Sequence, residues 1–196
     1  MSQVDFYYDF RSPFAYFATQ RMNLLTDVGA EIVWRPIYVS VLLNLQANKE
    51  PWAERDDPFC PAKRAHFMAD IFRLIEYWKI PFKMPSPAIP VCDEAMAIAA
   101  LLERDGTPHS EFRDAVFKAV WQEQKDAADP DVLRTCLAAG QHDPALLELA
   151  AEKGVDLLTQ NTVAAYESGV FGVPTFVVGD DLYFGADRME LLASRL

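Results

Sequence analysis

The stretch DFYYDFRSPFAYF, residues 5–17, joins a short aromatic run to a Ser-Pro step. The run Val4–Phe10 is rich in aromatic and branched side chains, which is typical of a β-strand. Ser12 is of a type that caps helices, and Pro13 suits the first helical position. Apolar residues then recur at helical spacing over Phe14–Leu25. The stretch therefore predicts a strand that leads directly into a helix, with a serine at the junction.

The two ends of the chain supply the remaining strands. EIVWRPIYV, residues 31–39, predicts a second strand, so the first segment forms a strand–helix–strand unit with a parallel pair. A helix is expected over residues 157–169. TFVV (175–178) and LYFG (182–185) flank the tight turn GDD and predict an antiparallel hairpin. A helix over residues 187–196 follows.

The middle of the chain predicts helices and almost no strand. A Pro-rich loop over residues 79–91 joins them, because prolines at that density prevent a helix. Five segments carry helical spacing or helix-start signals: 63–78, 93–106, 109–124, 129–140 and 143–154. This order of elements is that of an α/β thioredoxin-like fold with a large all-helical insertion. We expect a thioredoxin-like domain over residues 1–40 and 156–196, and an inserted helical domain over residues 41–155.

The composition fits a globular protein and disfavours several classes of function. The chain has 196 residues, of which 51% are apolar and 12% aromatic, as in a protein that buries a sizeable core. No apolar run approaches the ~20 residues of a membrane span, and the first residues lack a signal-peptide pattern. We therefore expect a cytoplasmic protein with no membrane partner. The net charge of −11 repels phosphate backbones and disfavours nucleic acid as a partner.

Cysteine and histidine are too scattered to predict a metal site. Cys60, Cys92 and Cys136 form no CxxC pair, and the three histidines are spread along the chain. We interpret the cysteines as buried or incidental thiols in a reducing compartment and predict no metal.

The two terminal motifs together resemble a known family. DFYYDFRSPFAY and GVFGVPTFVVGDDLYFGADRMELL are similar to segments of the 2-hydroxychromene-2-carboxylate isomerases and of the related kappa-class glutathione transferases, which are relatives of the DsbA oxidoreductases. The resemblance covers essentially the whole chain, although it is weak in the insertion. It implies a cis peptide bond at Val173–Pro174, whose backbone then faces a ligand beside the first helix. A disulfide oxidoreductase is disfavoured, because neither Ser12 nor Ala15 is a cysteine.

The resemblance implies that glutathione is the cofactor. In the family, a serine at the position of Ser12 faces the sulfur of bound glutathione. A free thiol is mostly protonated at neutral pH, and a hydroxyl beside the N–H groups of a helix start stabilises the thiolate without forming a disulfide. The Val173 backbone would pair with the cysteinyl part of glutathione, in a geometry that Pro174 enforces. The alternative is that Ser12 only caps the helix.

The segment FGADR, Phe184–Arg188, matches a family segment commonly written Gly-Asn-Asp-Arg and is expected to hold the γ-glutamyl end of glutathione. Phe184 and Gly185 open it, and Asp187 suits the glutamyl ammonium, while the helix start suits the carboxylate. Ala186 stands where the family usually has asparagine, so one side-chain hydrogen bond is missing. The alternative for Asp187 is another helix cap.

The resemblance also brings side chains of the insertion toward the site. Lys63 matches a family lysine and would give glutathione a counter-charge, unless it is a solvated surface group. Asn48 matches an asparagine near the mouth of the site. Arg11 lies outside the insertion, at a position where relatives vary, and we interpret it first as a surface group and second as a partner for a substrate carboxylate. His66 stands where relatives often carry tyrosine, and we interpret it first as a helix-surface or partly buried polar group. Five aromatic residues are candidates for the substrate wall and otherwise belong to the core: Phe59, Trp34, Trp52, Trp78 and Phe82.

The resemblance implies a glutathione-dependent isomerase that acts on a small aromatic catabolic intermediate by reversible thiolate addition. The alternatives are a kappa-like glutathione transferase or peroxidase, and a non-catalytic glutathione-binding thioredoxin-like module. Relatives are commonly dimers, so we also expect a homodimer.

Overall fold

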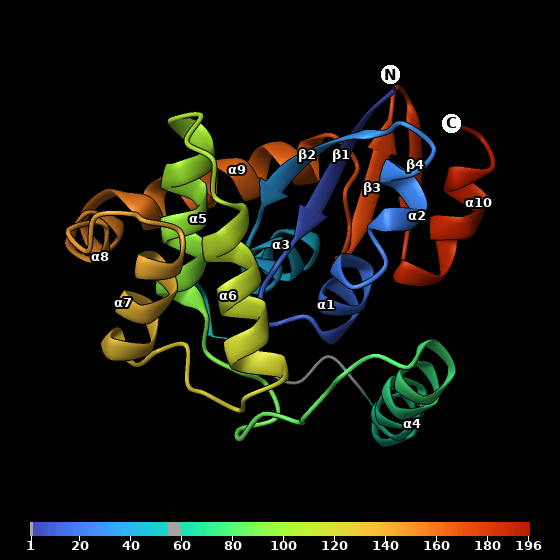
Figure 1. Cartoon of the computed structure of the whole chain (residues 1–196), viewed down its shortest axis with the longest axis horizontal. Helices are drawn as coiled ribbons and strands as arrows, with labels where there is room; N and C mark the ends of the chain where they lie inside the picture. Colours follow the sequence, from blue (N-terminus) through green and yellow to red (C-terminus); the bar gives the residue numbers. More distant parts are fainter. Residues whose placement is uncertain (1, 55–59) are drawn as a thin grey trace.

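A four-stranded mixed sheet forms the centre of the protein in the computed structural model, which describes residues 2–54 and 60–196. The strands are β1 (Gln3–Tyr8), β2 (Glu31–Pro36), β3 (Thr175–Val178) and β4 (Asp181–Phe184), and their order across the sheet is β2-β1-β3-β4 (Figure 1). β1 pairs with β2 in parallel and with β3 antiparallel, and β3 and β4 form an antiparallel hairpin. The parallel pair and the hairpin predicted from the sequence are both confirmed.

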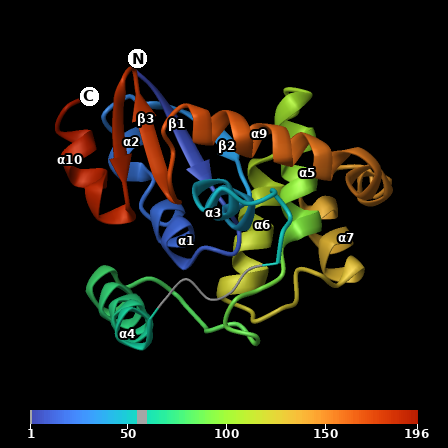
Figure 2. The ribbon, with the colours of Figure 1, turned by 180° about the vertical axis from the view of Figure 1, so that it is seen from behind.

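Helices cover both faces of this sheet (Figures 1 and 2). α1 (Pro13–Thr19), α2 (Asn23–Thr26) and α10 (Met189–Ala193) lie on one face, and α3 (Val39–Gln46) and α9 (Val155–Glu167) lie on the other. Alternate residues of β1 point into the core, where Val4, Phe6 and Tyr8 are fully buried.

The first connection differs from the sequence prediction in two places. The single helix predicted over Phe14–Leu25 is interrupted at residues 20–22, and this break separates α1 from α2. The predicted second strand ends at Pro36, and α3 begins three residues later. The strand stops because the next free backbone groups bond to side chains: Tyr38 N–H donates to Thr162 Oγ1 at 3.0 Å, and Val39 N–H donates to an Asp9 carboxylate oxygen at 2.9 Å.

The middle of the chain is helical, as predicted. Its longer helices are α4 (Pro61–Trp78), α5 (Asp93–Arg104), α6 (Ser110–Trp121) and α7 (Pro130–Ala139). The Pro-rich segment 79–91 between α4 and α5 has no regular structure. Among the described residues, no helix combines the length and the apolar character needed to cross a membrane. The division of the chain into a thioredoxin-like domain and a helical domain stays a prediction.

One predicted helix boundary is wrong. α8 (Leu146–Leu149) passes through a π-helical turn (Ala150–Gly154) directly into α9, although Gly154 reads in the sequence as a helix stop. Gly154 is buried, and a Cβ placed on it would lie 2.9 Å from the Cβ of Ala97 and 3.0 Å from its carbonyl oxygen. The glycine therefore serves close packing against α5 and does not end the helix.

α4 lies beside α1 and away from the sheet (Figures 1 and 2). The Phe67 ring of α4 packs on Phe14 with centroids 4.9 Å apart, and the Trp78 ring packs on Phe17 at 6.2 Å. Through these contacts α4 approaches the helix that begins after Ser12.

Candidate active site

Ser12 caps α1, as its position in the sequence predicts. Its hydroxyl oxygen accepts the N–H of Ala15 at 3.1 Å, and its own N–H donates to the carbonyl of Asp9 at 3.1 Å. The residue is half-buried, and the described residues offer no acceptor for its hydroxyl hydrogen. The hydroxyl hydrogen is therefore available to an acceptor outside the described residues.

The sheet brings the Val173–Pro174 segment beside this capped helix. Tyr7 of β1 pairs with Thr175 of β3, so the chain that precedes Thr175 runs alongside the residues that lead from β1 to Ser12. The Val173–Pro174 bond is cis, as the resemblance implies. The buried Val173 makes no backbone hydrogen bond within the described part of the chain, which leaves its N–H and C=O open to an extended ligand.

The segment that follows β4 meets the same place. Gly185 N–H donates to the Pro174 carbonyl at 2.9 Å, and the Gly185 backbone has a φ of 106°, a value that favours glycine. A 3₁₀ turn (Ala186–Arg188) comes next, with Ala186 buried and the Asp187 side chain 56% exposed. Phe184 is exposed and packs on Phe171 with ring centroids 4.8 Å apart. The structure thus gathers three predicted segments at one end of the sheet.

Asp9 belongs to this site and was missed by the sequence analysis. Its buried carboxylate accepts the N–H groups of Arg11 and Val39, both at 2.9 Å, so it ties the Ser12 turn to the start of α3. Burial raises the pKa of Asp9 to about 6, and the Arg11 guanidinium opposes that rise. The Asp-x-Arg spacing is compatible with such a turn, but only the fold shows that the carboxylate is buried.

Arg11 lies in a polar and aromatic cluster and is only half-exposed. Its guanidinium donates to Ser40 Oγ at 2.7 Å and lies 5.1 Å from the centre of the Tyr38 ring. The Tyr38 hydroxyl donates to Asp93, and burial raises the pKa of Tyr38 well above its usual value, so this donor stays protonated. Trp52 stacks on Tyr38, with the two ring centres 5.2 Å apart.

Of the other predicted side chains, three are exposed and one lies in the core. Lys63 and His66 are exposed on the first turns of α4, and Asn48 is exposed after α3 with a φ of 54°. Trp34 packs under Arg113 in the core, with the guanidinium 3.3 Å from its ring centre, so the structure does not bring it to Ser12.

The remaining aromatic candidates divide between the core and the undescribed segment. Phe82 stacks on Trp121 at 5.5 Å, and Trp78 lies beneath Arg21, whose guanidinium is 3.8 Å from the ring centre. Phe59 lies outside the described residues.

Arg21 is a second residue that the sequence analysis missed. Its side chain is 10% exposed and donates to the Ala186 carbonyl at 2.7 Å. It also forms an ion pair with Glu190. The break between α1 and α2 turns this side chain toward the 186–188 turn, which no helical periodicity would indicate.

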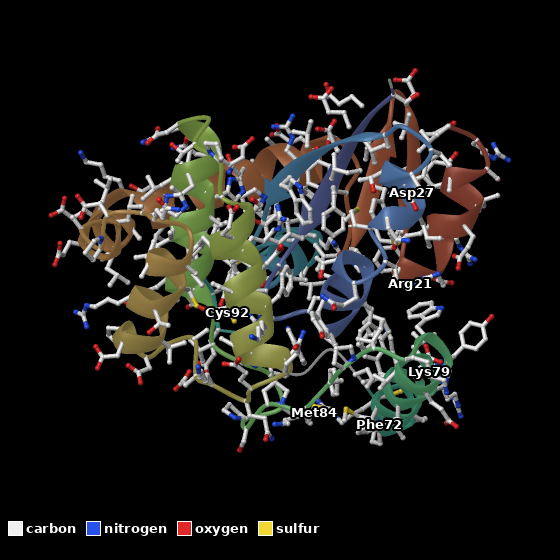
Figure 3. The ribbon with its side chains drawn as sticks, viewed as in Figure 1. Arg21, Asp27, Phe72, Lys79, Met84 and Cys92 are labelled. Carbon is white, nitrogen blue, oxygen red and sulfur yellow. The ribbon has the colours of Figure 1, made fainter. Side chains whose placement is uncertain are left out.

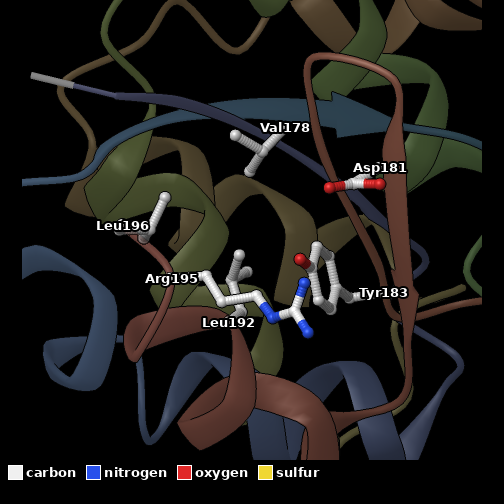
Figure 4. A pocket seen from close by; sticks show the side chains of 6 residues that line it. All are labelled: Val178, Asp181, Tyr183, Leu192, Arg195 and Leu196. Carbon is white, nitrogen blue, oxygen red and sulfur yellow. The ribbon is translucent and has the colours of Figure 1, made fainter.

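A surface depression of about 350 Å³ lies away from this site (Figure 4). Its lining includes Val178 and Asp181 at the closed end of the hairpin, whereas Pro174 and Gly185 lie at the other end. It contains none of the predicted site residues.

The three cysteines form no disulfide in the described part of the chain. Cys60, Cys92 and Cys136 are unpaired, and Cys92, labelled in Figure 3, is buried near the start of α5. Burial raises the pKa of Cys136 to about 11. The described residues contain no cluster of three or more histidine, cysteine or acidic groups suited to a metal.

Comparisons with known proteins identify the family of this chain. The family model of the DSBA-like thioredoxin domain matches residues 3–196. A 2-hydroxychromene-2-carboxylate isomerase of Sphingobium xenophagum is 30% identical over 196 residues, which cover 98% of this chain and 97% of the relative. Glutathione S-transferase kappa 1 of Homo sapiens is 25% identical over 211 residues, which cover 98% of this chain and 90% of the relative.

A solved structure extends the likeness to three dimensions. The structure of selenomethionine 2-hydroxychromene-2-carboxylate isomerase aligns with a TM-score of 0.79 and 25% identity, covering 98% of this chain and 93% of that chain. The resemblance predicted from the two terminal motifs is confirmed, and so is the thioredoxin-like fold. The chain belongs to the DSBA-like thioredoxin domain family.

Proposed function

We propose that this protein is a glutathione-dependent isomerase of small aromatic, carboxylate-bearing substrates. The observation that carries the proposal is the Ser12 hydroxyl, whose hydrogen has no acceptor among the described residues, at the head of α1 beside the cis Val173–Pro174 segment. The names of the similar proteins, an isomerase and a kappa-class glutathione transferase, support the same class of chemistry.

The site residues fit glutathione. The unpaired backbone N–H and C=O of Val173 suit the cysteinyl residue of an extended peptide, and the half-exposed Asp187 carboxylate suits the glutamyl ammonium. Lys63 on α4 is the proposed counter-charge for a glutathione carboxylate in a protein of net charge −11. When bound, glutathione supplies a thiolate nucleophile that adds reversibly to an electron-poor alkene and is released after the former double bond has rotated.

Ser12 favours the ionised form of that thiol. A hydrogen bond from the hydroxyl to a charged acceptor is worth about 1.5–3 kcal/mol, which corresponds to a lowering of the thiol pKa by about 1–2 units. Because a serine cannot form a mixed disulfide, the site keeps this donor and avoids thiol exchange.

The cluster around Arg11 is the proposed place for the substrate. The guanidinium provides planar donors for a carboxylate, and the stacked Tyr38–Trp52 pair provides an apolar surface for an aromatic ring. Asn48 and Phe59 stay candidates for the mouth of this site.

Thiolate absorbance of bound glutathione tests the proposal. We expect the wild type to lower the thiol pKa relative to free glutathione and Ser12→Ala to remove most of that shift, with binding retained. Ser168→Ala is the matched control, because its hydroxyl bonds the Ala165 carbonyl at 2.8 Å at the end of α9 and faces no predicted ligand. Absence of the shift in the wild type, or an unchanged shift in Ser12→Ala, refutes the catalytic role of Ser12.

Two simple measurements distinguish the isomerase from its two alternatives. A kappa-like transferase consumes glutathione with a model electrophile, whereas an isomerase returns it. A binding module holds glutathione without lowering its thiol pKa. We further propose a homodimer in a reducing cytoplasmic compartment, and sedimentation at micromolar concentration tests the assembly.

A further inference from the structure

We infer that Arg21 is a positioning residue that aims the Gly185–Asp187 turn at glutathione and joins it to α4. This inference rests on the proposed glutathione site, but it concerns a residue outside the predicted ligand contacts. Two contacts of the Arg21 guanidinium carry it, one with the Ala186 carbonyl and one with the Trp78 ring. Arg21 also pairs with Glu190, whose side chain is 58% exposed and is not needed for the inference.

The bond to Ala186 fixes the direction of one peptide group. Arg21 donates to the Ala186 carbonyl at 2.7 Å. In a planar trans peptide the C=O and the following N–H point in opposite directions, so the Asp187 N–H points away from Arg21. The same bond therefore fixes the direction in which the Asp187 N–H is presented to a ligand, while the Asp187 carboxylate also pairs with Arg188 at 3.4 Å.

Several contacts restrain the turn: two backbone hydrogen bonds close it, Arg188 forms an ion pair with Asp187 at 3.4 Å, and Ala186 is buried. Gly185 N–H donates to the Pro174 carbonyl at 2.9 Å, and Arg188 N–H donates to the Gly185 carbonyl at 3.1 Å. Both are backbone bonds at the ends of the turn, whereas Arg21 holds its middle. Ala186 has no polar side chain that could hydrogen-bond within the turn. The bond from Arg21 therefore contributes more to the orientation of this peptide group than it would beside an asparagine.

The same guanidinium reaches the helix on the other side of the site. It lies 3.8 Å from the centre of the Trp78 ring at the end of α4. Figure 3 shows Arg21 between Asp27, which follows α2, and Lys79, which follows α4. One side chain thus links α4, which carries Lys63, to the turn that carries Asp187.

The chain offers a matched control for removing a buried, stacked arginine. The Arg113 side chain is 9% exposed, against 10% for Arg21, and both lie over a tryptophan ring and pair with an acid. Arg113 stacks on Trp34 at 3.3 Å in the core, remote from the turn. Arg113→Met therefore imposes a similar loss of stability without touching the turn.

Calorimetric titration with glutathione tests the inference. We expect Arg21→Met to raise the dissociation constant of glutathione about tenfold, because one charge-assisted hydrogen bond is lost. The thiol pKa of bound glutathione and the turnover at saturating glutathione should stay at wild-type values. Arg21→Lys keeps the charge and a donor and should recover at least half of the affinity loss on a logarithmic scale. Glu190→Gln and Arg113→Met should change the constant by less than about threefold.

The outcomes separate this inference from the proposed function. If the wild type does not bind glutathione, the proposed function fails. If the wild type binds and Arg21→Met changes the constant by less than threefold, or if Arg113→Met weakens binding equally, the role of Arg21 is refuted. If Arg21→Met does not fold, NMR spectra of the backbone amides of the wild type test the inference instead. Saturation with glutathione should then shift the Asp187 N–H resonance. A resonance that does not move overturns the inference.

Discussion

Asp9→Asn should change how the stability of the protein depends on pH. The Asp9 carboxyl is buried, and burial raises its pKa from 3.8 to about 6. Between these two values the native state holds a proton that the unfolded chain has released. Native stability therefore falls as pH rises through this window, by about 1.4 kcal/mol for each pH unit and about 3 kcal/mol in total.

Asparagine removes this dependence because it does not ionise. Its amide also replaces one of the two acceptor oxygens that hold Arg11 and Val39, but that cost is the same at every pH and cancels in the comparison. The free energy of unfolding of the wild type minus that of Asp9→Asn should then fall by about 1.4 kcal/mol between about pH 5 and pH 7.5.

Urea unfolding, followed by circular dichroism at several pH values, measures this difference. Starting near pH 5 keeps the protein above its isoelectric point of about 4.6, where solubility is lowest. Asp27→Asn makes the same acid-to-amide change at an exposed position after α2 (Figure 3) and serves as the control for the substitution itself. A flat difference curve for Asp9→Asn, or one that rises with pH, would show that the buried carboxyl does not account for the pH dependence of stability.

Three further substitutions probe packing in the core, and each is measured as a shift of the urea midpoint at constant slope. Gly154→Ala should cost about 1–3 kcal/mol, because its Cβ would lie 2.9 Å from the Cβ of Ala97; no measurable loss would contradict the close packing. Trp121→Phe should cost about 3 kcal/mol, because it removes the indole N–H that donates to the Phe10 carbonyl at 2.8 Å, and a loss under 1 kcal/mol would argue that water replaces the bond. Tyr8→Phe should leave stability unchanged or raise it by up to about 1 kcal/mol, since the described residues offer its buried hydroxyl no partner; a clear loss would reveal an unrecognised one.

The sequence predicts the elements of this fold well where local rules decide them. The capped start of α1 at Ser12 and the hairpin around the GDD turn follow from residues that are neighbours in the chain. The end of β2 does not, because it depends on Asp9 and Thr162, which are distant in sequence and bond to the backbone at Tyr38 and Val39.

The same distinction holds for the candidate site. Ser12, Val173–Pro174 and Asp187 are visible as motifs, and the fold brings their segments to one end of the sheet. Arg21 and Asp9 are ordinary charged residues in the sequence, and their importance depends on burial that only the folded chain creates. Long-range contacts of this kind have no local signature.

The uninterrupted path from α8 through α9 has a consequence for how the molecule opens. This helix packs on α5 and, farther along, on α3 and β2. Melting of the elements on either side would expose the flank of the helix that packs on them. Hydrogen exchange should therefore report one shared protection level for the sheet and the helices around α5, and both should unfold in a single step.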